Sequence, residues 1–179
     1  MEIYLIRHTK PAIMPGVCYG QTDVELEPTF PLEATQIRDK LKGVNFDAVF
    51  SSPLLRCTQL AELLYSDYSI SPLLAEMHFG KWEGWTWDDI FHDKAGKEWM
   101  DNYLEIRCPN GESFLDLKNR IIEFFESISI HGYSKIAVFT HAGVIRVVKG
   151  LCENIQEKNI FSKPLQYGEI YIAKINDLL

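Results

Sequence analysis

Apolar residues recur along the chain with two different spacings. Short runs of branched and aromatic residues at 3–6, 46–51 ("FDAVFS") and 135–140 ("KIAVFT") are typical of buried strands. The second and third runs lead directly into segments whose apolar residues recur every three or four positions, which predicts helices after Ser52 and from about Ala142. Because a helix follows a strand at least twice, we expect an α/β protein with a largely parallel sheet and helices on both faces.

Three further elements extend this pattern. We expect helices at 31–42 and 113–127 and a last strand within 168–176, whose alternation of apolar and polar residues is typical of a sheet edge. In the helix that follows the second strand, Ser52 is expected to cap the amino terminus and Pro53 to take the first helical position.

The segment 73–107 is rich in Trp and Asp and has no clean periodicity, so we expect it to be an insertion. Ligands in α/β folds bind beyond the carboxyl ends of the strands, where this insertion would form a roof. The stretch 109–113 ("PNGES") predicts a turn into the next helix, with Ser113 as its cap and Asp116 three residues on. Since the sequence shows no repeat, we expect a single domain over 1–179.

Composition and charge narrow the classes of function. With 46% hydrophobic and 24% charged residues, the chain has the composition of a globular protein. Its net charge of −7 argues against nucleic acid or an anionic membrane as a partner. The start lacks the pattern of a signal peptide and no apolar run reaches roughly 18 residues, so we expect a cytoplasmic protein. The four cysteines form neither a C-x-x-C pair nor a Cys-x5-Arg motif, which argues against a zinc site and a cysteine-based phosphatase.

Basic residues follow all three predicted parallel strands. Arg7 and His8 follow the first strand, Arg56 follows the second, and His141 follows the third. If these strands are neighbours, two guanidinium groups and two imidazoles converge, and planar guanidinium groups match the oxygens of a phosphate. The helix from about Ala142 would add free backbone N–H groups at the same point. The sequence therefore predicts a site for a phosphoryl group.

A phosphatase also needs a nucleophile and a proton donor. Neighbouring cations lower the pKa of an imidazole, and His8, at the tight end of the first strand, is the better candidate for a neutral nucleophile. The stretch 73–84 ("LLAEMHFGKWEG") offers two carboxyl groups, those of Glu76 and Glu83, beside aromatic side chains. A carboxyl group under partly apolar cover can protonate a leaving alkoxide and then activate water.

Five ordered motifs, from "LIRHT" through "SSPLLRCTQLA", "EMHFGKWEG" and "PNGESF" to "THAGVIR", together resemble the histidine phosphatase superfamily, the phosphoglycerate-mutase-like phosphatases. The resemblance implies a three-layer α/β/α sandwich of the phosphoglycerate-mutase type. It also implies that His8 is the nucleophile and that Arg7, Arg56 and His141 bind the phosphoryl oxygens. By the same resemblance Glu76 is the proton donor, and neither a metal nor an organic cofactor is needed.

Within that superfamily, "RHT" followed by "CYGQTDVEL" is similar to the α-ribazole phosphatases, which remove the 5′-phosphate from α-ribazole 5′-phosphate during assembly of the cobalamin nucleotide loop. The resemblance implies that Gln21 and Thr22 lie beside the phosphate and contact the substrate, whereas Glu83 has a structural role. Four aromatic residues would either form flat walls for a nucleoside or pack the roof itself; these are Phe79, Trp82, Trp85 and Trp87.

Several other functions remain open. A small-molecule phosphatase of broad specificity and a phosphoryl transferase of the phosphoglycerate-mutase type would use the same residues, although this chain is shorter than the mutases that it resembles. A binding module for phosphorylated ligands would need neither His8 nor Glu76. A metal site on His8 and His141 is the weakest alternative, since arginines beside it would repel a cation. The sequence leaves open whether the protein is a monomer or a homodimer.

Overall fold

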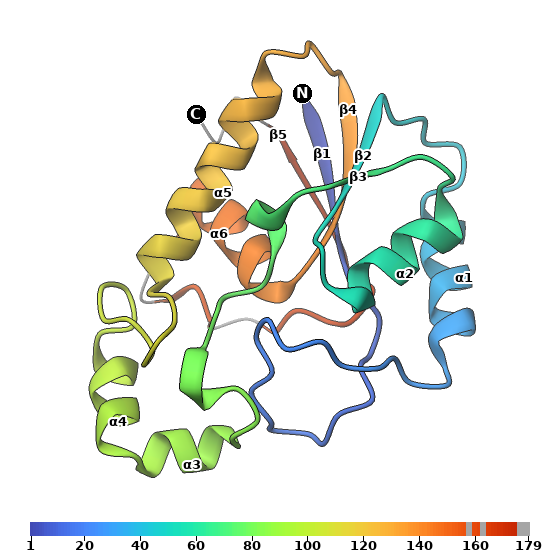
Figure 1. Cartoon of the computed structure of the whole chain (residues 1–179). Coiled ribbons are helices and arrows are strands. Elements are labelled where there is room, and N and C mark those ends of the chain that lie inside the picture. The colour runs from blue at the N-terminus through green and yellow to red at the C-terminus, as the bar shows by residue number, and fades with distance from the viewer. Residues whose placement is uncertain (157–158, 162–163, 175–179) are drawn as a thin grey trace.

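A computed structural model describes residues 1–156, 159–161 and 164–174 (Figure 1). Within these residues five strands form one sheet in the order β3-β2-β4-β1-β5. The strands are β1 (Glu2–Arg7), β2 (Ala48–Ser51), β3 (Ser69–Ile70), β4 (Lys135–Thr140) and β5 (Ile170–Lys174). All neighbours are parallel except β5, which runs antiparallel to β1 at one edge. The prediction of a mostly parallel sheet with a late edge strand is confirmed.

Helices cover both faces of the sheet (Figure 1). One face carries α1 (Phe30–Lys40) and α2 (Leu55–Leu64), and the other carries α5 (Phe114–Ser129) and α6 (Ala142–Cys152). Alternate residues of each strand supply the two apolar layers: in β1, Ile6 packs with α1 and α2, while Ile3 and Leu5 pack with α5 and α6. The three-layer α/β/α sandwich is confirmed.

Several local predictions need correction. The helix that was expected to start at Pro53 starts at Leu55, with Leu54 as its cap residue, and Ser52 is not its N-cap. The Ser52 hydroxyl instead forms a hydrogen bond of 2.7 Å with the ring of His141, so it does not cap the helix. By contrast, Ser113 caps α5 as predicted, in a reciprocal pair of hydrogen bonds with Asp116.

Element boundaries differ from the predictions by a few residues. The helix predicted over 31–42 spans Phe30–Lys40, and the strand predicted over 46–51 begins only at Ala48. In place of a strand, the Asp47 carboxylate accepts the N–H groups of Ser134 and Lys135, at 2.6 and 2.8 Å. The end of the last predicted strand, 175–176, lies outside the described residues.

The Trp-rich segment contains four short elements. They are η1 (Pro72–Leu74), η2 (Gly80–Trp82), α3 (Trp87–His92) and α4 (Lys94–Asp101). In Figure 1, α3 and α4 lie beyond the end of the sheet at which the parallel strands terminate. The helices were not predicted because each is short and begins at a polar cap, Thr86 for α3 and Asp93 for α4, rather than at an apolar period.

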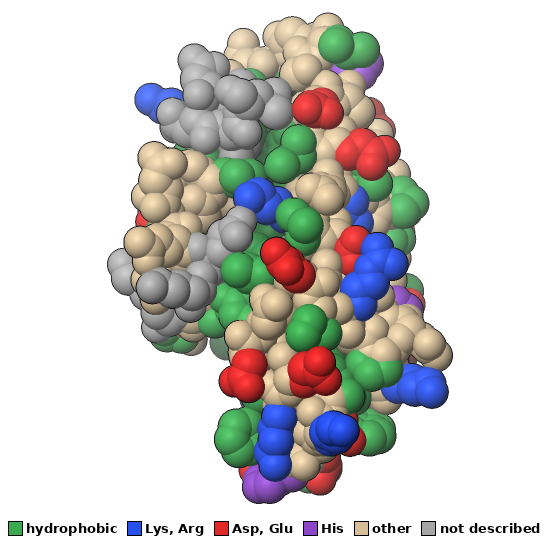
Figure 2. Space-filling view, turned by 90° about the vertical axis from the view of Figure 1, so that its left-hand side faces the viewer, with side chains coloured by type: hydrophobic (Ala, Val, Ile, Leu, Met, Phe, Trp, Pro, Cys, Tyr) green, Lys and Arg blue, Asp and Glu red, His purple; other side chains and the backbone are tan. Residues whose placement is uncertain are grey.

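On the face shown in Figure 2, acidic and basic side chains are interspersed and hydrophobic side chains lie between them. None of the helices in the described part of the chain has both the length and the apolar character that crossing a bilayer requires.

Candidate active site

The register of the sheet brings two histidines together at the carboxyl ends of adjacent strands. Arg7 ends β1 opposite Thr140, which ends β4, so His8 and His141 follow at the same level. The His8 N–H donates to the Thr140 carbonyl at 3.0 Å, and the two imidazole centroids are 5.2 Å apart. Both histidines are almost fully buried. This arrangement fixes the two rings on the rigid end of the sheet.

His8 is held as a neutral imidazole with a defined tautomer. Its Nδ1 lies 2.7 Å from the Thr9 carbonyl oxygen, and since a carbonyl can only accept, Nδ1 carries the proton and Nε2 keeps its lone pair. Burial, and then the positive charges of Arg56 and Arg7, hold the pKa of His8 well below its usual value. Nε2 of His8 is therefore a free nucleophilic nitrogen at neutral pH.

His141 occupies a similar environment but has a side-chain partner. Its Nε2 lies 2.7 Å from the Ser52 hydroxyl and 3.5 Å from the Cys57 Sγ. Burial and then the charge of Arg56 hold the pKa of His141 well below its usual value, and burial raises the pKa of the Cys57 thiol to about 12. Cys57 is therefore a buried thiol that packs against the site, and not a thiolate.

Two guanidinium groups are oriented by backbone carbonyls and aromatic rings. Arg56 is fully buried and donates to the carbonyls of Gly20 and Thr22, at 2.6 and 3.0 Å. Arg7 donates to the Leu165 carbonyl, and its Cζ lies 4.0 Å from the centroid of the Tyr167 ring. Within the described part of the chain, the buried Nε atoms of both arginines have no hydrogen-bond partner. Buried donors without acceptors beside two histidines make a site that suits an anion.

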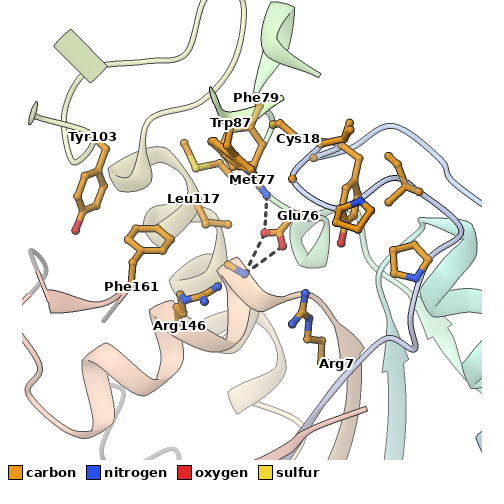
Figure 3. Close-up of a pocket in the computed structure, with 18 of the residues that line it drawn as sticks. Arg7, Cys18, Glu76, Met77, Phe79, Trp87, Tyr103, Leu117, Arg146 and Phe161 are labelled. Atoms are coloured by element: carbon orange, nitrogen blue, oxygen red, sulfur yellow. Dashed lines mark hydrogen bonds between the residues drawn. The ribbon is translucent and has the colours of Figure 1, made fainter. Parts of the chain in front are cut away.

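Glu76 lies at the amino terminus of α6. Its Oε1 accepts the N–H groups of Met77 and Gly143, at 2.9 and 3.1 Å, and its Oε2 has only a longer bond of 3.2 Å to the Gly143 N–H (Figure 3). A Cβ atom on Gly143 would lie 2.2 Å from Oε1, so this approach requires glycine. Figure 3 shows the carboxylate pointing into the pocket between Leu117 and Arg7.

Arg120 of α5, which the sequence did not single out, fixes the backbone that carries Glu76. It donates to the carbonyls of Leu73, Ala75 and Glu76 at 2.6 to 2.9 Å, and it pairs with the Glu112 carboxylate at 2.8 Å. No local signal marks this residue, because the carbonyls that it binds lie more than 40 positions away in the sequence.

Gln21 and Thr22, the residues expected to contact the substrate, form hydrogen bonds within the protein itself. The N–H groups of Gln21 and Thr22 donate to Glu83, at 3.0 and 2.8 Å, and the Gln21 side-chain amide donates to the Glu76 carbonyl at 2.9 Å. Glu83 therefore organises this loop. Ala142 begins α6 and is 7% exposed.

A cavity of about 690 Å³ opens beside these groups. Arg7, Glu76 and Gly143 line it, and most of the remaining wall is apolar. Two of the four aromatic residues singled out from the sequence, Phe79 and Trp87, line it (Figure 3). The other two do not: Trp82 is buried in the core, and Trp85 is 43% exposed. Among the described residues no cluster of three or more His, Cys, Asp or Glu side chains is arranged to hold a metal ion.

The model of the histidine phosphatase superfamily (branch 1) matches residues 3–177. This chain belongs to that superfamily. The adenosylcobalamin/alpha-ribazole phosphatase of Escherichia coli (strain K12) is 31% identical over 156 residues, which cover 83% of this chain and 77% of that protein. The structure of the alpha-ribazole phosphatase from Shigella flexneri superposes with a TM-score of 0.85 at 25% identity and covers 96% of this chain and 89% of the other.

Members with other names are also similar. The structure of a phosphoglycerate mutase from Thermus thermophilus superposes with a TM-score of 0.77 at 28% identity, over 96% of this chain and 92% of the other. This member of the superfamily therefore shares its fold with both phosphatases and mutases. The predicted resemblance to α-ribazole phosphatases is confirmed.

Proposed function

We propose that the protein is a phosphomonoesterase that transfers the phosphoryl group of its substrate to His8 and then to water. One observation carries this proposal: the Nδ1 proton of His8 is fixed on the Thr9 carbonyl, so Nε2 has a free lone pair beside Arg7 and Arg56. A site that only bound phosphate would gain more from a protonated imidazole than from a neutral one.

In the first step His8 Nε2 forms a bond to phosphorus while the bond from phosphorus to the leaving oxygen breaks. Arg7 and Arg56 hold the phosphoryl oxygens, and the amino terminus of α6 adds its positive dipole. We assign the proton for the leaving alkoxide to Oε2 of Glu76, the oxygen with the weaker hydrogen bonding. The products of this step are phosphohistidine, the free alcohol and a Glu76 carboxylate.

In the second step the Glu76 carboxylate takes a proton from water, whose oxygen attacks phosphorus as the bond to Nε2 breaks. Phosphate leaves, and His8 and protonated Glu76 are restored. Every proton in this scheme moves through Glu76, and no metal ion is required.

We further propose that the substrate is α-ribazole 5′-phosphate, which would place the enzyme in assembly of the cobalamin nucleotide loop. The names of the relatives in Escherichia coli and Shigella flexneri support this substrate. The cavity of about 690 Å³ is within the range that small-molecule sites occupy, and its aromatic wall suits a flat base. Gln21 and Thr22 would act on this substrate by holding the loop of Tyr19 and Gly20, which line the cavity.

Phosphate release in EDTA tests both parts of the proposal. We would compare kcat/KM for α-ribazole 5′-phosphate, 3-phosphoglycerate and phenyl phosphate, with His8→Asn as the inactive control. A large preference for α-ribazole 5′-phosphate supports the substrate. Similar low values for all three retain the phosphatase and reject the substrate, and transfer of the phosphoryl group to an acceptor in preference to water would identify a mutase.

A further inference from the structure

One arginine in the cavity has no role in the scheme above. Arg146 of α6 lines the cavity, and its Nε is buried without a hydrogen-bond partner. Among the described residues no hydrogen bond or ion pair from its guanidinium to a carboxylate or carbonyl is found, and its Cζ lies 5.2 Å from the centroid of the Phe161 ring. Figure 3 shows Arg146 beside Phe161, across the pocket from Phe79 and Trp87.

Arg146 feels the charges of Glu76 and Glu169, but neither carboxylate forms an ion pair with it among the described residues. Three cations line the cavity, Arg7, Lys10 and Arg146, against a single carboxylate, that of Glu76. Burial lowers the pKa of Arg146, but a guanidinium stays protonated at neutral pH. A buried charged donor without an acceptor is costly, so a ligand that brings an acceptor to this point gains free energy that no side chain here supplies.

Arg146 lies about one and a half turns of α6 away from His141. It follows His141 by five residues on the same helix, which separates the two by about 7 Å along the helix axis. Arg7 and Arg56 already lie at the phosphoryl end with the two histidines. Arg146 instead lies against Phe161 in the cavity wall, and the rings of Tyr103 and Phe114 pack against Phe161.

These neighbours restrict the kind of acceptor. Aromatic walls favour a flat ring, and a planar guanidinium donates best to an acceptor in its own plane, such as a ring nitrogen. The indole N–H of Trp99, which also lines this cavity, is a second buried donor without a hydrogen-bond partner among the described residues.

We propose that Arg146 is a specificity-determining residue that donates a hydrogen bond to a ring nitrogen or oxygen of a heteroaromatic base in the alcohol half of the substrate. The substrates are then phosphomonoesters of nucleosides, and in α-ribazole the acceptor is the unsubstituted nitrogen of the benzimidazole. This inference rests on the proposed function in assigning the alcohol half, but the recognition that it describes needs no phosphoryl transfer.

Binding of unphosphorylated nucleosides therefore tests it. Isothermal titration calorimetry would compare α-ribazole with its indole analogue, in which C–H replaces the acceptor nitrogen. We expect the unmodified protein to bind α-ribazole about tenfold to a hundredfold more tightly, and Arg146→Met to bind both equally. Lys10→Met is the matched control, because Lys10 is a lining cation that already pairs with Glu27 at 3.6 Å, and it should keep the discrimination.

Equal binding of the two nucleosides by the unmodified protein would overturn the inference, as would discrimination that survives in Arg146→Met. If Arg146→Met leaves the affinity for both nucleosides unchanged but lowers kcat/KM for 3-phosphoglycerate, the guanidinium binds a carboxylate. That result would also overturn the inference. Failure of the proposed function is distinguishable, since it is seen as a lack of phosphate release and leaves the binding comparison intact.

Discussion

Gly143→Ala should impair protonation of the leaving group and leave the other steps of the reaction largely intact. The added Cβ would lie 2.2 Å from Glu76 Oε1 and 3.2 Å from Leu117 Cδ2. Restoring an ordinary van der Waals contact requires the carboxylate to move by about 1 Å or more. A displacement of that size at a catalytic group lowers a rate by about a hundredfold.

The substitution should have little effect on folding. The clash falls on the free end of a flexible side chain, and alanine is favoured over glycine in a helix by about 1 kcal/mol, which offsets the weakened hydrogen bonds of Glu76. We expect the melting temperature to change by a few degrees at most, and thermal unfolding followed by circular dichroism would measure it.

The assay compares two leaving groups. An alkoxide needs a proton as it leaves, whereas p-nitrophenolate does not. We expect kcat/KM of Gly143→Ala to fall about a hundredfold for α-ribazole 5′-phosphate and less than about tenfold for p-nitrophenyl phosphate. Adding Glu76→Gln should cause little further loss, because the two changes act on one group. Equal losses on both substrates, or no loss on either, would refute the assignment of Glu76.

Three further outcomes are expected. As the pH falls below about 6.5, the free energy of unfolding should decrease by at most about 1.4 kcal/mol per pH unit for each of His8 and His141. The reason is that these histidines bind protons in the unfolded chain but stay neutral when buried in the folded protein. Urea titrations at several pH values would measure the decrease, and a free energy that does not change with pH would contradict it. Arg120→Met should lower the free energy of unfolding by about 3 kcal/mol and lower kcat/KM on alkyl phosphates, whereas Arg107→Met, which removes the exposed pair with Asp116, should leave both nearly unchanged. Dialysis against EDTA should leave activity unchanged, and recovery of lost activity by an added divalent ion would argue for a metal enzyme.

The main strands and their parallel arrangement were predictable because they follow from local patterns. The strands 3–6 and 135–140 are short apolar runs, and the rule that parallel strands end at one edge placed His8 beside His141 without any knowledge of their contacts. The capping pair of Ser113 and Asp116 was equally readable, since it depends on residues three positions apart.

The remainder depends on contacts between distant parts of the chain. Ser52 has the local signature of a helix cap, but the ring of His141, 89 residues away, competes for its hydroxyl. In the segment 73–107 no period distinguishes an aromatic residue in the core, such as Trp82, from one that lines the cavity, such as Trp87. Arg146 belongs to the quoted motif "THAGVIR", yet only the three-dimensional structure shows that its buried Nε has no hydrogen-bond partner among the described residues.

Trapping of the covalent intermediate tests the central claim most directly. The enzyme would be mixed with radiolabelled α-ribazole 5′-phosphate or p-nitrophenyl phosphate and quenched in alkali, where phosphohistidine survives, and the labelled peptide would be identified by mass spectrometry. We predict label on the peptide that contains His8, lost on treatment with acid and absent in His8→Asn. Label on His141 or on a serine, or turnover without any labelled protein, would contradict the account.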